Sequence, residues 1–334
     1  MSDEDTPHHA NADEPLPDTP LTAGLIQPSI SLLARTGDGL SHAYTRLSLP
    51  SHSLTDIAIL KNYTNLRYVD LSMNAIADLS PLANLEFLLS LDAHGNRVEV
   101  VGRELGGRKW LQWVDLRNNG IRNWEAGDWP MCGWLTLDDN ALTTLSLPTF
   151  PSLLHLSLTR NTLERLHPLG APKLQKLYLS HNPLGAVAGV DLDDKPALQV
   201  LHLRECGLGS LEGIGGREGA GLDGLVYLNL RGNNLSSTAE IDRLAHMHSL
   251  RILVLTDNPL TSHPTYRLEI LARLPKLERL DKEPIGDDER EEAGAYKIQM
   301  VAKRGGEDGE GGEEAEADAE GESDGQGEEP QDDD

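Results

Sequence analysis

Apolar residues recur along most of this chain in one fixed arrangement, with a polar residue at a constant place in each copy. The stretch from 152 to 166 shows the arrangement most clearly, through Leu153, Leu156, Leu158, Asn161, Leu163 and Leu166. The frame returns nine more times, with its asparagine position at His52, Asn74, Asn96, Asn119, Asn140, Asn182, Cys206, Asn233 and Asn258. Successive copies are 21 to 27 residues apart. Ten copies in phase at this spacing predict a stack of structural repeats.

The template assigns a role to each position. Leu156 and Leu158 flank Ser157, which predicts a short strand with the leucines pointing inward and the serine outward. A single copy cannot bury its apolar edge, whereas stacked copies share one core. At the turn after the strand, the amide of Asn161 can bond main-chain groups that would otherwise lack partners. The pattern L-x-x-L-x-L-x-x-N-x-L is that of a leucine-rich repeat, so we expect an α/β repeat solenoid.

The segments on the outer side of this solenoid should be short. Ile76, Leu79 and Leu82 are three residues apart, which fits a 3₁₀ turn better than a long helix. We therefore expect a gently curved arc of about ten repeats with short convex turns. The first and last repeats would each expose half a core, so we also expect an N-terminal helical cap and a C-terminal leucine-rich repeat cap.

These expectations divide the chain into six segments. Residues 1–20 and 305–334 are acidic and poor in apolar residues, so we expect both to be disordered. Between them we expect an N-terminal cap at 21–43, repeats at 44–262, a C-terminal cap at 263–285 and a helical extension at 286–304. The extension begins with acids and ends with Lys303 and Arg304, an order that the helix dipole favours.

Binding is expected on the concave face, because solenoids use that extended surface for their partners. One outward column there includes Tyr68, Trp113, Trp134, His155 and Tyr227, and a second includes Asp70, Asp92, Asp115, Tyr178 and His202. The aspartates taken alone are typical of a solvated acidic face. Large amphipathic rings at outward positions are better explained by a partner surface. We predict that these ten residues form a protein-binding site.

The sequence contains no arrangement typical of catalysis or cofactor binding. Residues 219–224 match G-x-G-x-x-G, but they lead into a repeat strand, whereas the dinucleotide-binding motif follows a strand and opens a helix. Outward His155 and His202 lack the cysteine or glutamate that would complete a zinc site. We therefore predict a protein that is not an enzyme and that uses no cofactor, no metal and no small-molecule substrate.

Charge and targeting patterns narrow the class of partner. The net charge is −25. Residues 305–334 contain fifteen acidic residues and residues 1–20 contain six, and neither segment contains a lysine or arginine. This acidity argues against nucleic acid as a partner. The first residues lack the basic and apolar regions of a signal peptide, and no run of 18 apolar residues exists. Cys132 and Cys206 lie within repeat frames and give no disulfide framework. We expect an intracellular protein without a membrane partner.

Two stretches outside the template carry a closer resemblance. Residues 31–44, SLLARTGDGLSHAY, lead into LTDI at 54–57, and LERLDKE at 277–283 is followed by an acidic stretch at 287–292. Together they resemble the leucine-rich repeat-containing protein 23 family, whose flagellate-alga relative is radial spoke protein 15. The likeness implies a structural component of axonemal radial spokes that supports spoke assembly and motility. It also implies a location in the cytoskeleton of the cilium or flagellum and other radial spoke and axonemal proteins as partners.

Other interpretations remain open from the residues. The amphipathic segment 266–281 is similar to the cap of the short-repeat class that includes the spliceosomal U2A-prime protein and the Sds-type phosphatase regulator. The main alternative is therefore a regulatory subunit of a protein phosphatase, whose acidic concave face would bind a catalytic subunit. An RNA-processing partner in the nucleus is a further alternative.

Overall fold

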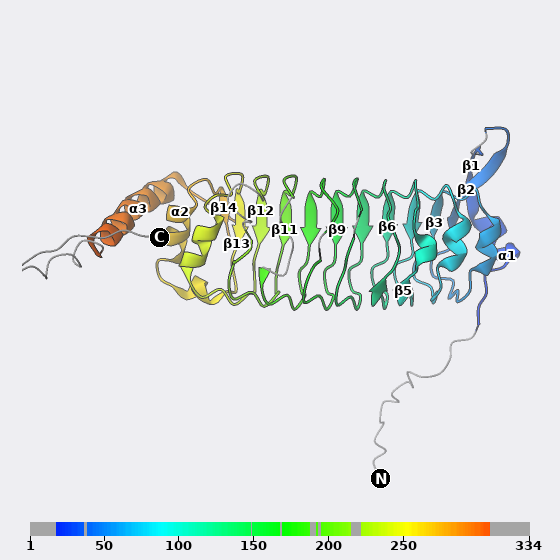
Figure 1. The fold of residues 1–334 in the computed structure, drawn as a ribbon, viewed down its shortest axis with the longest axis horizontal. Helices are drawn as coiled ribbons and strands as arrows, with labels where there is room; N and C mark the ends of the chain where they lie inside the picture. The colour runs from blue at the N-terminus through cyan, green and yellow to red at the C-terminus, as the bar shows by residue number, and fades with distance from the viewer. Residues whose placement is uncertain are drawn as a thin grey trace, which may run out of the picture.

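The computed structural model describes residues 18–36, 39–147, 149–167, 169–187, 192, 195–214 and 222–307, with side chains to residue 299. Residues 1–17 and 308–334, for which we expect disorder, lie outside these ranges. The described chain forms an elongated solenoid in which successive repeats each add one strand to a continuous sheet (Figure 1). The predicted leucine-rich repeat solenoid is confirmed.

One sheet of 13 strands runs the length of the solenoid. Its parallel strands are β2 (His42–Ser48), β3 (Tyr68–Asp70), β4 (Ser90–Asp92), β6 (Trp113–Asp115), β8 (Trp134–Thr136), β9 (His155–Ser157), β10 (Lys176–Tyr178), β11 (Val200–His202), β12 (Tyr227–Asn229), β13 (Ile252–Val254) and β14 (Arg279–Leu280). Strands pair without slipping, so that Leu135 lies opposite Leu156, and Leu156 opposite Leu177. Equivalent template positions therefore form straight columns across the sheet.

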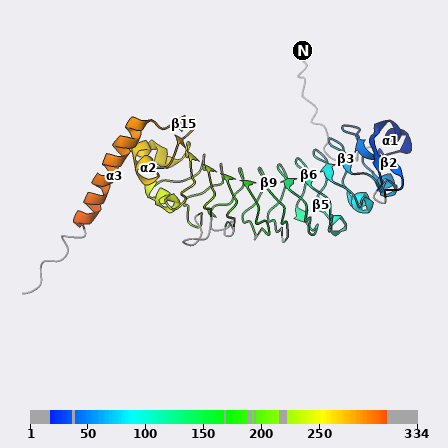
Figure 2. The ribbon, with the colours of Figure 1, turned by 90° about the horizontal axis from the view of Figure 1, so that it is seen from above.

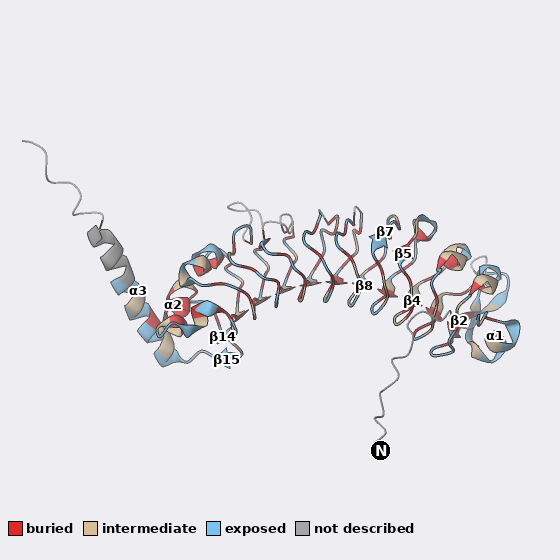
Figure 3. Ribbon diagram, turned by 90° about the horizontal axis from the view of Figure 1, so that it is seen from below, coloured by how far each residue is buried: buried red, intermediate tan, exposed pale blue. Residues whose placement is uncertain are grey.

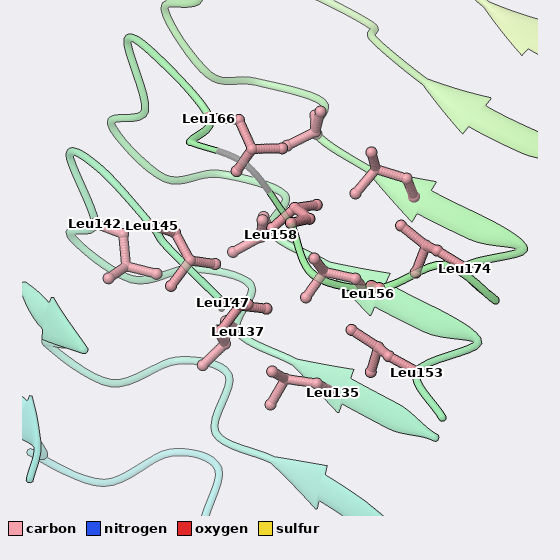
Figure 4. Packing of buried hydrophobic residues seen from close by; sticks show 14 of the residues in the cluster. Leu135, Leu137, Leu142, Leu145, Leu147, Leu153, Leu156, Leu158, Leu166 and Leu174 are labelled. Atoms are coloured by element: carbon pink, nitrogen blue, oxygen red, sulfur yellow. The ribbon is translucent and has the colours of Figure 1, made fainter. Parts of the chain in front are cut away.

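The inward leucines form one continuous core. Leu153, Leu156 and Leu158 have no exposed surface, and the cluster to which they belong extends from Leu21 to Leu280. Figure 4 shows equivalent leucines of neighbouring repeats stacked on one another, and Figure 3 shows buried positions recurring along the solenoid. A fully buried leucine contributes about 1.5 to 3 kcal/mol relative to an exposed one. The core therefore stabilises each repeat through its neighbours.

Short elements line the convex side. They include the 3₁₀ helices η1 (Ala58–Asn62), η2 (Ser80–Asn84), η3 (Arg103–Leu105), η5 (Thr238–Leu244) and η6 (Pro259–Ser262), and a small parallel sheet of β5 (Val100–Val101) and β7 (Asn123–Trp124). Such elements are narrower than packed α-helices, so the convex side is only slightly wider than the strand side. Figure 2 accordingly shows a shallow arc with the strands on its inner side.

A ladder of asparagine side chains joins successive repeats. Asn161 Nδ2 donates to the carbonyl oxygens of Leu137 and Leu158 at 2.9 and 3.1 Å, and its Oδ1 accepts from the N–H of Leu142 at 3.1 Å. The same contacts recur at Asn74, Asn96, Asn119, Asn140, Asn182, Asn233 and Asn258. At Cys206, the Sγ atom lies 3.4 Å from the carbonyl oxygen of Leu179. The ladder satisfies the turn that follows each strand, as the template predicts.

The N-terminal end is covered by one short helix and a hairpin. Helix α1 (Ala23–Ser29) buries Ile26, and β1 (Ile30–Arg35) pairs antiparallel with β2. The N-terminal cap is therefore less helical than expected. Pro28 disfavours continuation of the helix, and the β-branched Ile30 favours a strand. Residues 18–20, expected to be disordered, pair with the segment at Thr55 and Asp56. Several apolar side chains of the hairpin stay exposed: Leu32, Leu33, Leu40 and Tyr44.

Near the C-terminal end, a side chain replaces one carbonyl group of the main-chain ladder. In the stack, the N–H after each strand donates to a carbonyl of the next repeat, as Leu230 does to Val254 at 2.8 Å. At the last repeat, Leu255 donates instead to Oδ1 of Asp281 at 2.6 Å. Helix α2 (Tyr266–Arg273) supplies the second contact, because the Tyr266 hydroxyl donates to Oδ2 of Asp281 at 2.7 Å. The carboxylate thus takes the place of one main-chain carbonyl, while the sheet continues through β14 and β15.

Helix α3 spans Asp287–Glu307, whereas the helical extension was expected at 286–304. After the short strand β15 (Glu283–Pro284), which pairs antiparallel with β14, α3 packs on α2. Arg267 holds it through two contacts with Glu289, Nε to Oε1 at 2.5 Å and an N–H to Oε2 at 3.0 Å. Among the described residues, no helix has the length and apolar character needed to cross a lipid bilayer.

Candidate functional site

The sheet register places all ten predicted residues on the concave face. Each strand turns its middle residue into the core and its first and third residues outward. The first-residue column contains Tyr68, Trp113, Trp134, His155 and Tyr227, and the third-residue column contains Asp70, Asp92, Asp115, Tyr178 and His202. The structure therefore gathers the ten residues into two adjacent rows.

Five of these residues form one continuous run of rings, which we call the aromatic stack. Trp134 lies flat on His155, with ring centroids 3.5 Å apart and planes 5° apart. The run continues through Tyr178, His202 and Tyr227, with centroid distances of 5.1, 4.7 and 5.0 Å. It crosses from the first column to the second after His155 and returns at Tyr227. Each ring is therefore held by its neighbours, which limits its motion before any partner binds.

Burial keeps the aromatic stack uncharged near neutral pH. His155 is only 9% exposed, and burial, followed by the charge of Lys176, lowers its pKa from 6.5 to about 4. Burial also lowers the pKa of His202 and raises the pKa values of Tyr178 and Tyr227. Rigid, neutral rings of this kind supply large contact area at low entropic cost, which is the property of anchor residues in protein interfaces.

The predicted aspartates precede the aromatic stack along the solenoid. Asp70 accepts a hydrogen bond at 3.1 Å from the turn that follows it, and Oδ1 of Asp92 lies 2.6 Å from Nδ1 of His94. Asp115 is 4% exposed and lies 3.1 Å from Nε of Arg117. Burial raises the pKa of Asp115 above its ordinary range, although Arg117 opposes this effect. Asp70 and Asp92 therefore fit the description of a solvated acidic face, whereas the buried Asp115 does not.

Tyr68 and Trp113 lie on the acidic side of the face. The guanidinium carbon of Arg46 lies 5.2 Å from the ring centroid of Tyr68, a cation–π arrangement. Trp113 lines a hollow together with Trp134, Asp138 and other residues of strands β6 to β10. Among the ring contacts of the described residues, none joins Tyr68 or Trp113 to the aromatic stack. The predicted aromatic residues thus separate into a five-ring unit and two individual rings.

Three exposed apolar residues near this hollow were not predicted. Trp110, Met131 and Leu154 are 46, 44 and 42% exposed and lie just before strands β6, β8 and β9. They occupy variable positions of the template, where solvent exposure usually favours polar residues. That departure from the template is the sequence signal that could have found them.

One trio of described residues has spacing that could suit a metal ion. Ligand atoms of Asp92, His94 and Asp115 lie within 4.8 Å of one another. However, Asp115 already contacts Arg117 at 3.1 Å, and Nδ1 of His94 lies 2.6 Å from Asp92, so contacts within the protein account for the arrangement. The two cysteines are buried, and burial raises the pKa of Cys132 to about 12 and that of Cys206 to about 11. Neither thiol is prepared to act as a nucleophile at neutral pH.

Family models match two parts of the chain. Residues 64–79 match one described as leucine-rich repeat, and residues 191–307 match a second with the same description. A human protein named leucine-rich repeat-containing protein 23 is 40% identical over 289 residues, which cover 86% of this chain and 82% of that protein.

The chain is also similar to other proteins over shorter stretches or at lower identity. Human cilia- and flagella-associated protein 410 is 31% identical over 33% of this chain and 41% of its own length. Dynein axonemal light chain 1 of Chlamydomonas reinhardtii is 37% identical over 19% of this chain and 35% of its own length. Among solved structures, the leucine-rich repeat domain of APL1B is 24% identical with a TM-score of 0.48, covering 64% of this chain and 61% of that one.

Proposed function

We propose that this chain, which belongs to the leucine-rich repeat-containing protein 23 family, is a non-catalytic scaffold of motile cilia and flagella. In this proposal it is a structural part of the axonemal radial spokes and supports spoke assembly and beating. Its partners are other spoke and axonemal proteins, which it holds through its concave face. The names of the two shorter relatives, one ciliary and one axonemal, support the same location.

The aromatic stack is the observation that carries the scaffold role. A run of ordered rings on an exposed sheet face costs solvation without contributing to the leucine core, whereas it offers a partner preorganised anchors. The acidic side of the face is the observation that favours the second candidate, a phosphatase regulatory subunit.

The test is to delete the gene in a motile ciliated cell and restore it with a tagged copy. We expect the tagged chain to remain in detergent-extracted axonemes and to co-purify with radial spoke subunits. We also expect deletion to leave spokes incomplete when axonemes are imaged by cryo-electron tomography. A chain recovered with a phosphatase catalytic subunit, or concentrated in nuclei, would favour the alternatives.

Substitutions then test the binding face. The double variant Trp134→Ala and Tyr227→Ala removes both end rings of the aromatic stack. We expect it to enter axonemes less than the natural chain does. Ile298→Ala is the matched control, because Ile298 is a large apolar residue that is 73% exposed on α3, away from the strands. Normal incorporation of the double variant, at unchanged expression and melting temperature, would show that the aromatic stack is not the binding site.

A further inference from the structure

The concave face carries opposite charges at its two ends. In each repeat, the strand and the turn after it comprise six residues, counted from the first residue of the strand. In repeats β3 to β8, five aspartates (Asp70, Asp92, Asp115, Asp138 and Asp139) are present with one arginine, Arg117, giving a charge of −4 with histidine neutral. Arg46 in the first column of the preceding strand β2 brings the charge at this end to −3. In repeats β9 to β13, Arg160, Lys176, Arg204 and Arg231 are present with Glu205 and Asp257, giving +2.

From this asymmetry we propose that the concave face binds one extended segment of a partner protein with its own charges separated. The basic residues of the segment lie over β3 to β8, and its acidic residues lie over β9 to β13. The proposal rests on the function proposed above, since it names the chemistry of a partner for the same face. It also fixes which end of the partner segment lies nearest the N-terminal cap.

The two ends are far enough apart to be recognised separately. Neighbouring strands are about 4.8 Å apart, so the nine strands from β3 to β13 span about 38 Å. At physiological ionic strength, exposed charges are screened over about 8 Å. A partner with mixed charges would therefore meet repulsion at both ends, whereas a segment with separated charges is attracted at both. An extended chain of about 12 residues covers the same distance.

Some charges on this face are already paired, whereas others are available to a partner. Asp115 is buried against Arg117 at 3.1 Å, and Asp139 lies 3.6 Å from Arg160 across the boundary between the two ends. Within the basic end, Nε of Arg231 lies 2.6 Å from Asp257, and the outer atoms of both side chains remain more than a third exposed. Exposed pairs of this kind are weak and can exchange partners. In the acidic end, Asp138 accepts hydrogen bonds from the hydroxyl of Ser157 at 2.5 Å and the N–H of Thr159 at 2.7 Å. Those uncharged donors leave its negative charge uncompensated when it is ionised.

The aromatic stack lies across the basic end, beginning at the boundary between the two charges. Trp134 belongs to the last acidic repeat, and the other four rings belong to basic repeats. Neutral rings at this place can contact the middle and acidic part of the segment without opposing either charge. The rings thus supply contact area, while the flanking charges select the orientation.

The test uses two synthetic 12-residue peptides, each with four arginines, four serines and four glutamates. In one peptide the arginines and glutamates form separate blocks, and in the other they alternate. Binding to the purified full chain is measured by fluorescence anisotropy at low and physiological salt. We expect the block peptide to bind about tenfold more tightly than the alternating one, with the difference shrinking as salt rises. Equal binding, or no binding by either peptide, would overturn the proposal.

Position is tested with the same block peptide carrying a photoreactive group at its arginine end. We expect cross-links within 68–118, and cross-links confined to 176–257 would overturn the proposed orientation. The variant combining Asp70→Asn and Asp92→Asn keeps side-chain acceptors for the local hydrogen bonds and should abolish the preference for the block peptide. Glu86→Gln, an exposed acid outside the strands, is the matched control and should leave that preference unchanged.

These measurements use no cilia, so they separate the two proposals. Preference for the block peptide in a chain that fails to enter axonemes rejects the spoke function and supports the charged face. Entry into axonemes without that preference supports the spoke function and rejects the charged face.

Discussion

Trp134 and His155 lie face to face, with planes 5° apart and centroids 3.5 Å apart, although 21 residues separate them in the sequence. Parallel pairing of β8 with β9 makes them direct neighbours. Trp134 remains 40% exposed, whereas His155 is 9% exposed. The tryptophan therefore covers the histidine and contributes to the burial that lowers its pKa to about 4.

That burial predicts a specific dependence of stability on pH. The pKa of His155 is about 4 in the folded chain and about 6.5 when unfolded, so the unfolded state binds the proton more readily between these values. Neutral His155 thus makes its full contribution to the free energy of unfolding above about pH 6.5. As pH falls toward 4, this free energy decreases by about 2 to 3 kcal/mol.

The measurement is the difference in unfolding free energy between the natural chain and His155→Phe at several pH values. Phenylalanine keeps a ring in the stack but does not titrate. We expect the natural chain to lose stability relative to the variant as pH falls from 7 to 4. A constant difference over that range would contradict the proposed protonation state.

Two leucines that lie two residues apart provide a matched test of the core. Leu156 has no exposed surface, whereas Leu154 is 42% exposed, two residues earlier. Leu156→Ala should lower the free energy of unfolding by about 2 to 5 kcal/mol, because it leaves a cavity between repeats. Leu154→Ala should change it by less than about 0.5 kcal/mol. Chemical denaturation monitored by circular dichroism distinguishes these outcomes, and similar losses in both variants would mean that the strand register is wrong.

The contact between Tyr266 and Asp281 should control fraying of the last repeats. Tyr266→Phe removes the 2.7 Å hydrogen bond and should cost about 1 kcal/mol, while Asp281→Ala also frees the amides of Leu255 and Thr256 and should cost more. Hydrogen exchange gives the local readout. We expect faster exchange at those two amides in Asp281→Ala, with the amide of Leu156 unchanged. Unaltered protection at Leu255 would show that the carboxylate does not hold these amides.

The attachment of α3 should weaken in acid. Hydrogen bonding from Arg267 lowers the pKa of Glu289 from 4.5 to about 2. A lowered carboxyl pKa stabilises the folded state above pH 4.5, and this stabilisation is lost as pH falls toward 2. Glu289→Gln should therefore lower the protection factors of the α3 amides at pH 6 to values that the natural chain shows only in stronger acid. Glu283→Gln is the control, because Glu283 is 77% exposed at its side chain and lies 3.8 Å from Arg267.

The sequence alone determines the columns of the concave face but not the contacts within them. The leucine template predicts that Trp134 and Tyr178 both point outward, because strand alternation follows from backbone geometry. It cannot predict that the aromatic stack crosses between columns after His155, since that depends on how each ring leans toward the next repeat. The template also gave no reason to expect a carboxylate at Asp281 to replace a carbonyl, because the last repeat departs from the consensus.

Strand direction reverses at both ends of the sheet, at the β1–β2 pair and at the β14–β15 pair. A second solenoid therefore cannot continue the parallel ladder at either end, because the strand it would need to extend is already covered. The number of repeats in one polypeptide then fixes how far apart two attached neighbours are held. Insertion or deletion of a single repeat would change that separation by about 5 Å.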